Sequence, residues 1–360
     1  MTSSSDPIST VSQRLERFAA DRHAEVAGLG DEAVGFVASA LAAIHGGKRL
    51  RARFLDAGYR AVGGSVDGAD AADVAGVAGA LEIFQAAALV HDDLVDNSDT
   101  RRGRPAAHRA LENQHRGASW LGDAELFGRA AAVLLGDLLV AWSDDLLEES
   151  IADHPRAADV RRQYAMMRRD VTIGQYLDVA EEAAYASAPE NAHAGRALRI
   201  ASYKSARYSV QQPLLIGAAL GGGSAAQRDA LGRFGHTVGL AFQLRDDVLG
   251  VFGDAAVTGK PSGDDLREGK RTVLVAYARE TLDESDRAEL DAGLGDRGLT
   301  DEQISRLQHL VASSGAVDRI EDDITRLTAE AHAALTGAPI SAGAVTTLMT
   351  LGEAAMQRSA

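Results

Sequence analysis

Two pairs of aspartates stand in this chain with the spacing of metal-binding carboxylates. In the first pair, Asp92 and Asp96 of HDDLVD are four residues apart, so both lie on one face of a helix covering residues 81–96. Carboxylates one helical turn apart repel each other, which destabilises the helix. A bridging cation removes this repulsion, and hard oxygen ligands suit Mg²⁺. An acidic, solvated helix end is the ordinary alternative for the same pattern.

The second pair lies in FQLRDDVLG. On a helix, Gln243, Asp246, Asp247 and Gly250 share one face. Apolar residues surround these acids, and aspartates are costly to bury there unless they are paired or bind a metal. If the two acidic helices face each other across a bundle, they can hold one polyphosphate through several Mg²⁺ ions.

Basic residues accompany both pairs. Arg101 and Arg102 follow the first pair, and arginines bind phosphate oxygens bidentately. Further cations stand after a Gly-Gly turn and in later segments: Lys48, Arg49, Arg51, Arg53, Lys204, Lys260 and Lys270. Each one alone is typical of a surface. Their combination with two carboxylate pairs indicates a site for a metal-bound diphosphate.

Composition excludes several other classes of protein. The net charge of −15 argues against binding to nucleic acid or to anionic lipid. The absence of cysteine excludes disulfides and thiolate chemistry and fits a reducing compartment, so we expect a cytoplasmic protein. The polar start lacks the apolar core of a secretory signal. We expect no membrane span, since the most apolar stretch, residues 74–90, is interrupted by Glu82 and Gln85.

Long helices must position these residues, because prolines are few and strand alternation is nearly absent. The patterns predict helices over residues 12–27, 31–44, 48–62, 70–96, 124–150, 156–184, 194–220, 225–250, 271–281, 285–294, 301–313, 315–337 and 342–357. Loops are expected at 63–69, 97–123, 185–193 and 253–270, where Gly, Pro, Ser and Asp gather. We expect a flexible lead over residues 1–12 and one domain over residues 13–360.

Five segments together resemble the trans-isoprenyl diphosphate synthase (polyprenyl synthetase) family. They are GGKRLRA, HDDLVDNSDTRRGRP, Lys204-Ser205, FQLRDD and the stretch TGK…GDDLREGKRT, in this order. The resemblance implies an all-α fold, a large antiparallel helical bundle with a central cavity known as the isoprenoid synthase type I fold. It also implies a homodimer that condenses isopentenyl diphosphate with an allylic diphosphate.

The resemblance also implies a role for each matching residue. Asp92 and Asp96 correspond to ligands of two Mg²⁺ ions, with Asp93 supporting them, and Asp246 to the ligand of a third ion, with Asp247 beside it. The residues implied in binding the allylic diphosphate are Arg101, Lys204, Gln243 and Lys260. The residues implied in binding isopentenyl diphosphate are Lys48, Arg51, Gln85 and Arg102. Ser205 keeps the hydroxyl of the threonine that the family usually has.

Two positions depart from the family pattern. Ala52 replaces a usual proline, and Gly250 replaces the third aspartate of the second acidic motif. In the family this last acid is the most peripheral one. We therefore expect activity to survive without it, and we expect Gly250→Asp to change catalysis little.

Product length depends on the residues that precede the first aspartate pair. In the family, bulky aromatics four or five residues before the first aspartate stop growth at fifteen carbons, whereas here Ala88 and Ala87 stand there. The next large side chain is Phe84, one helical turn deeper, which predicts geranylgeranyl diphosphate with twenty carbons. Alternatively, Phe84 packs in the core and a residue of another helix limits the length of the product.

Other functions remain as alternatives. The product could be farnesyl or a longer polyprenyl diphosphate. A terpene cyclase of the same fold would need no isopentenyl site, and Lys48 and Arg51 argue against it. A non-catalytic subunit of a two-part prenyltransferase would lack the aspartates that this chain retains.

Overall fold

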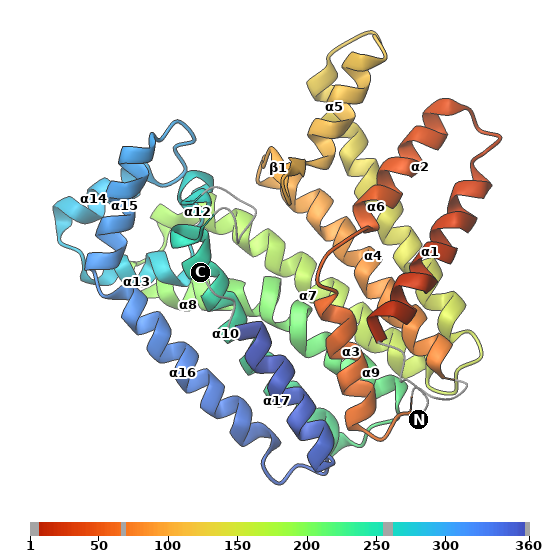
Figure 1. Ribbon diagram of the computed structural model, residues 1–360. Helices are drawn as coiled ribbons and strands as arrows, with labels where there is room; N and C mark the ends of the chain where they lie inside the picture. Colours follow the sequence, from red (N-terminus) through yellow and green to blue (C-terminus); the bar gives the residue numbers. More distant parts are fainter. Residues whose placement is uncertain (1–6, 66–69, 255–261, 357–360) are drawn as a thin grey trace. The chain divides into compact units, whose positions relative to one another are not determined.

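The regular structure of this chain is helical almost throughout, which confirms the all-α prediction. The computed structural model describes residues 7–65, 70–254 and 262–356. Within these residues the strands form a single short hairpin, β1 (Thr100–Arg101) paired antiparallel with β2 (Arg104–Pro105) (Figure 1).

The chain divides into two compact units. The first unit comprises residues 1–160 with 217–222, and the second comprises residues 161–216 with 223–360. The single domain over residues 13–360 therefore stays a prediction.

The first unit is built around α4 (Ala71–Val95). This helix packs along α6 (Ala124–Ile151) and also contacts α1 (Pro7–Glu25), α2 (Asp31–Ile44) and α3 (Leu50–Ala61). Small residues allow the close packing, because a Cβ atom at Gly76 would overlap the side chain of Ser150 on α6. Helix α5 (Ala107–Gly117) also belongs to this unit and packs on α6.

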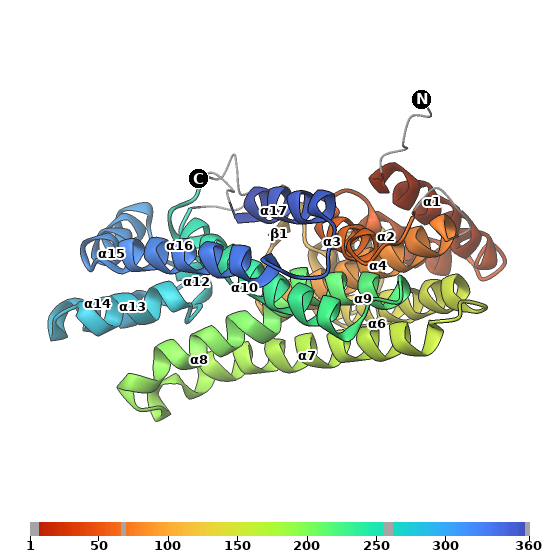
Figure 2. The ribbon, with the colours of Figure 1, turned by 90° about the horizontal axis from the view of Figure 1, so that it is seen from below.

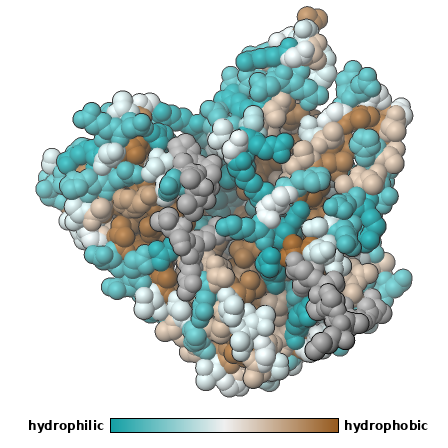
Figure 3. Space-filling view, in the orientation of Figure 1, coloured by the Kyte–Doolittle hydropathy of each residue, from teal (hydrophilic) through white to brown (hydrophobic). Residues whose placement is uncertain are grey.

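The second unit is built around α10 (Ala225–Phe252), which begins with a capping box formed by Ser224 and Gln227. On one side α10 packs against the π-helix η3 (Ala201–Gln211), and on another against α16 (Ala316–Leu335), which lies beside it in Figures 1 and 2. Hydrophilic residues gather over α14 and α15 on the face drawn in Figure 3. The other elements with residues in this unit are α7 (Ala157–Ala184), η1 (Tyr185–Ser187), η2 (Glu190–Ala192), α8 (His193–Ile200), α9 (Gln212–Leu220), α12 (Asp264–Glu268), α13 (Val273–Thr281), α14 (Glu284–Gly293), α15 (Asp301–Ser313) and α17 (Ala342–Met356).

Five regions differ from the sequence-based expectation. Helix α1 begins at Pro7, inside the lead expected over residues 1–12. The segments expected to be loops, 97–123 and 253–270, contain α5 and α12, and the expected loop 185–193 contains η1 and η2. The single helix expected over residues 194–220 is instead α8, a π-helical segment and α9 in succession.

Helix α4 is long and apolar enough to cross a membrane by length and composition. However, 78% of its most apolar window is buried inside the structure. This burial is what a core helix of a folded protein shows.

Candidate active site

The first acidic motif ends α4. Gln85, Ala88, Asp92 and Asp96 form a half-exposed stripe along this helix, whereas the neighbouring Ala87 is buried. The helix continues to the motif, since the Asp96 N–H donates to the Asp92 carbonyl oxygen at 2.8 Å. The structure therefore places the two carboxylates one turn apart at the end of a half-exposed face.

Arg101 neutralises part of this motif. From strand β1, its Nε donates to Asp93 Oδ1 at 2.8 Å and its Nη2 donates to Asp92 Oδ2 at 3.3 Å. Asp93 is buried, with 3% of its surface exposed. Asp93 is thus the anchor of the Arg101 guanidinium, while the carboxylates of Asp92 and Asp96 are half-exposed.

The basic residues of the first unit meet at the Gly-Gly turn before α3. Gly46 and Gly47 have φ angles of +82° and +88°, which favour glycine. A Cβ atom on Gly47 would lie 2.9 Å from Arg102 Nη2, so the Arg102 guanidinium rests against this turn, next to Lys48. The structure brings together two of the cations expected at the isopentenyl diphosphate site, and Lys48 is exposed.

Glu82 is a buried anchor of this basic turn that the sequence analysis did not assign. Its Oε1 accepts a hydrogen bond from the Ala52 N–H at 3.1 Å, and its Oε2 lies 3.5 Å from Arg49 Nη1. Burial lowers the pKa of Arg102, and the charges of Arg101 and Arg49 lower it further. Such a concentration of cations favours an anionic ligand. The sequence signal that could have identified Glu82 is a single charged residue within an apolar run, because buried charges are normally paired.

In the second unit, Asp247 is buried and Asp246 is half-exposed. Gln243 Nε2 donates to Asp247 Oδ1 at 2.7 Å. Burial raises the pKa of Asp247 well above its ordinary value, and the charges of Asp265 and Asp246 act in the same direction, while the Gln243 hydrogen bond opposes them. The arrangement agrees with Asp246 as the more accessible carboxylate and Asp247 behind it.

Lys204 and Ser205 lie half-buried in the π-helix, and π-helical segments often occur at functional sites. Two glycines let neighbouring helices approach this segment. A Cβ atom on Gly174 of α7 would overlap the backbone at Lys204, and one on Gly239 of α10 would overlap the Ala206 carbonyl oxygen. Lys204 Nζ lies 2.5 Å from Asp178 Oδ2 of α7, a partner that the sequence analysis did not identify.

The remaining predicted residues divide as follows. Lys260 lies outside the described residues, so its role stays a prediction. Lys270 forms an ion pair with Glu268 at 3.1 Å. Asp92, Asp93, Asp96 and their basic neighbours belong to the first unit, whereas Asp246, Asp247, Gln243 and Lys204 belong to the second.

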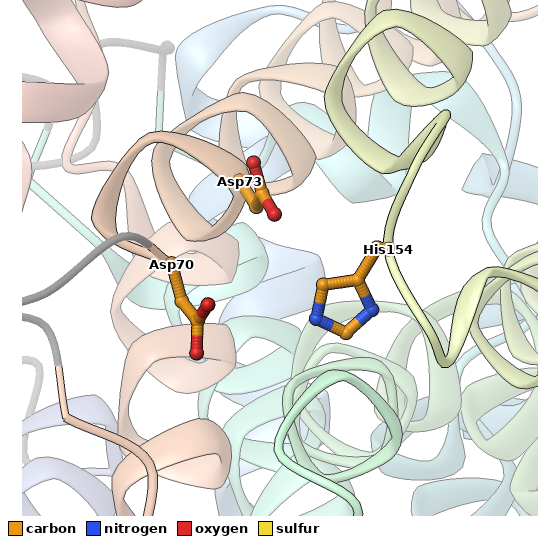
Figure 4. Close-up of side chains that lie close together, drawn as sticks. All are labelled: Asp70, Asp73 and His154. Atoms are coloured by element: carbon orange, nitrogen blue, oxygen red, sulfur yellow. The ribbon is translucent and has the colours of Figure 1, made fainter.

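A third carboxylate group, with a histidine, lies elsewhere in the first unit (Figure 4). The ligand atoms of Asp70, Asp73 and His154 lie within 4.8 Å of one another. However, Asp70 Oδ2 accepts a hydrogen bond from the Tyr59 hydroxyl at 2.9 Å, and His154 Nδ1 accepts one from the Arg156 N–H at 3.1 Å. A neutral imidazole that accepts at Nδ1 carries its proton at Nε2 and keeps no lone pair for a metal. We therefore assign this group to the packing of the ends of α4 and α6.

The half-exposed carboxylates of Asp92 and Asp96 in the first unit lie one helical turn apart and offer hard oxygen atoms, which suit Mg²⁺. In the second unit, the half-exposed carboxylate of Asp246 offers the same kind of ligand atom. These oxygen ligands differ from the nitrogen and sulfur ligands typical of zinc sites.

Comparisons with known proteins identify the family of this chain. The sequence model of the family described as Polyprenyl synthetase matches residues 36–331, and the chain belongs to this family of prenyl-transferring enzymes. A crystal structure of geranylgeranyl pyrophosphate synthase from Corynebacterium glutamicum, complexed with isoprenyl diphosphate and magnesium, is 36% identical. It has a TM-score of 0.91, with 98% of each chain covered.

Two curated relatives support the same family. The short chain isoprenyl diphosphate synthase of Methanocaldococcus jannaschii is 32% identical over 65% of this chain and 64% of its own length. The geranylgeranyl diphosphate synthase of Mycobacterium tuberculosis is 34% identical over 66% of this chain and 60% of its own length. The chain thus spans somewhat less than two thirds of these two relatives. Others of similar identity are named farnesyl and geranylfarnesyl diphosphate synthase, so the names leave the product length open.

Proposed function

We propose that this protein condenses isopentenyl diphosphate with an allylic diphosphate, head to tail and in the trans configuration, to make geranylgeranyl diphosphate and pyrophosphate. The observation that carries the proposal is the α4 stripe. Half-exposed Asp92 and Asp96 end this stripe, and the small Ala88 lies one turn before Asp92 on the same face. A diphosphate held at the carboxylates would thus direct its hydrocarbon tail along an apolar helix.

In the proposed reaction, the allylic C–O bond breaks and its electron pair leaves with the pyrophosphate. Asp92, Asp96 and Asp246 would hold three Mg²⁺ ions, which would neutralise the negative charge on that pyrophosphate. Arg101 and Lys204 add positive charge to the same leaving group. The alkene of isopentenyl diphosphate then attacks the allylic cation, which forms the new C–C bond, and the pyrophosphate accepts the proton that is lost.

The second substrate site is proposed at the Gly-Gly turn, where Lys48 is exposed beside Arg102. Removing the ammonium group with Lys48→Ala should raise the Michaelis constant for isopentenyl diphosphate by on the order of 10- to 100-fold, since a hydrogen bond to a charged group is lost. The Michaelis constant for the allylic substrate should change far less. Steady-state kinetics with each substrate varied in turn measure both constants.

A matched control for Lys48→Ala is Arg60→Ala. Arg60 lies near the end of α3, the helix that begins just after Lys48, and pairs with Asp56 at 2.8 Å. This control should leave both Michaelis constants near the wild-type values. A larger effect of Lys48→Ala on the allylic substrate would overturn the assignment of the two sites.

We further propose that the protein is a homodimer whose subunits contact each other through α6. Three large apolar side chains of this helix, Leu126, Val133 and Leu134, are exposed by 44% or more. Exposed apolar groups on one element are typical of an interface with a second copy. Leu134→Asp should therefore weaken dimerisation, measured by sedimentation velocity, by about 10-fold or more.

Leu29→Asp provides the control for this experiment, because Leu29 is at least as exposed as Leu134 but lies outside α6. This variant should remain a dimer. A monomeric wild-type protein, or a Leu134→Asp protein that dimerises normally, would contradict the proposal.

We also propose that the protein acts in the cytoplasm, where a cysteine-free chain is at no disadvantage.

A further inference from the structure

The backbone spacing of the π-helix η3 decides where the Lys204 side chain points. Just before this segment, the Ala201 N–H donates to the Ala197 carbonyl oxygen, four residues earlier, as in an α-helix. At the other end, the Gln212 N–H donates to the Arg207 carbonyl oxygen, five residues earlier. A π-turn therefore holds one residue more than an α-turn. The place at which the π spacing begins sets the direction of Lys204, which follows Ala201 by three residues.

A hydrogen bond from the neighbouring helix α10 holds the start of this π-helical segment. Ser202 Oγ and His236 Nε2 lie 2.8 Å apart. Burial lowers the pKa of His236, and the positive charge of Arg207 lowers it further. These effects favour a neutral imidazole, which can accept a hydrogen bond from the Ser202 hydroxyl at Nε2. The residue directly after Ala201 is thus attached to α10.

The residues after Lys204 are held by contacts with a different helix. Arg207 Nη1 donates to Oδ2 of the buried Asp170 on α7 at 3.1 Å. The same guanidinium lies 3.9 Å from the centroid of the Tyr203 ring. Lys204 therefore lies between a polar anchor at Ser202, made by α10, and another at Arg207, made by α7. Both ends of the turn that carries its ammonium group are fixed.

We propose that His236 is a positioning residue for the allylic diphosphate. Its hydrogen bond to Ser202 fixes the place at which the π spacing begins, and this keeps the ammonium group of Lys204 directed at the diphosphate. Without the bond, the start of the π spacing can move by one residue, which rotates Lys204 about the helix axis. This inference rests on the proposed function, in which Lys204 binds the allylic diphosphate.

The test removes the bond from either side and then restores it. Ser202→Ala removes the hydroxyl, His236→Leu removes the ring nitrogens, and His236→Gln keeps an acceptor at a similar reach. Isothermal titration calorimetry with geranyl diphosphate and Mg²⁺, without the second substrate, measures binding without turnover. Ser202→Ala and His236→Leu should each raise this dissociation constant roughly 3- to 10-fold, the effect of one hydrogen bond. His236→Gln should restore tight binding, and the dissociation constant for isopentenyl diphosphate should stay near the wild-type value throughout.

Combination with Lys204→Ala separates positioning from a general effect on the fold. If the bond acts through Lys204, Ser202→Ala should add less than about 2-fold to the effect of Lys204→Ala, because no ammonium group remains to be directed. A general loosening of the segment would instead add its full effect in both backgrounds. The matched control is Thr237→Ala, next to His236 on α10, whose hydroxyl donates to the Arg233 carbonyl oxygen of its own helix at 2.9 Å. This control should bind both diphosphates as the wild type does.

Thermal unfolding monitored by circular dichroism identifies any variant that fails to fold. If His236→Leu does not fold, Ser202→Ala decides, since it removes a single hydroxyl. If Ser202→Ala binds geranyl diphosphate normally, or adds its full effect to Lys204→Ala, this inference is wrong while the proposed function stands. A Lys204→Ala protein that binds geranyl diphosphate normally would overturn this inference together with the proposed role of Lys204.

Discussion

Replacing Asp92 or Asp246 by alanine should lower turnover by on the order of 10³-fold or more while the protein stays folded. Each substitution removes a half-exposed carboxylate that the proposed mechanism uses to hold Mg²⁺. Without the metal, the charge that develops on the leaving pyrophosphate loses most of its stabilisation. Initial rates at saturating concentrations of both substrates, with circular dichroism to monitor folding, measure the effect.

Two acidic residues close to these positions serve as controls. Asp99 lies just beyond the first motif and pairs with Arg109 at 2.7 Å, and Asp229 lies on α10 and pairs with Arg233 at 3.2 Å. Asp99→Ala and Asp229→Ala should retain near-normal turnover, because surface ion pairs contribute little. If Asp92→Ala or Asp246→Ala retained the same rate as its control, the metal assignment would be wrong.

Ala88→Phe should change the product from geranylgeranyl to farnesyl diphosphate. Ala88 lies on the half-exposed face of α4, one turn before Asp92, so a phenyl ring there would block the tail early. One helical turn rises about 5.4 Å, close to the length of one isoprene unit. Phe84, one turn deeper, should be the natural stop, so Phe84→Ala should give longer products. Chromatography of the dephosphorylated products shows both shifts.

The burial of Phe84 also fits a purely structural role in the core. A control variant separates this role from the proposed role of Phe84 in stopping chain growth. Phe84 is 7% exposed, and its truncation should cost roughly 3–5 kcal/mol of stability. Ile83→Val reduces the packing at the neighbouring, fully buried position of α4 without opening the proposed path of the hydrocarbon tail. Its product should stay at twenty carbons. If both Ala88→Phe and Phe84→Ala left the product unchanged, a residue of another helix would be the one that limits product length.

Helical periodicity predicted the long helices because their apolar faces are regular. The buried side of α5 consists of His108, Leu111, Glu112 and His115, so only one of its buried residues is apolar. The repeat of buried positions was therefore present but hidden from a count of apolar residues. Helix α12 has only five residues, too few to show a repeat.

The acidic motifs were visible because local spacing along one helix reveals them. Their partners were not visible, because tertiary packing brings these residues together. Glu82 reaches the start of α3, Asp178 reaches Lys204 from a neighbouring helix, and Asp265 fills the space beside Gly250. A sequence motif thus predicted the metal-binding carboxylates, whereas only the fold shows the residues that hold their neighbours in place.

Product analysis of the purified protein tests the central claim most directly. The protein is incubated with labelled isopentenyl diphosphate and each short allylic diphosphate, with Mg²⁺ or with a chelator, and the products are separated by chain length. We expect geranylgeranyl diphosphate in the presence of Mg²⁺ and no elongation with the chelator. A cyclic hydrocarbon formed from the allylic substrate alone, or no incorporation of isopentenyl diphosphate with any starter, would contradict the account.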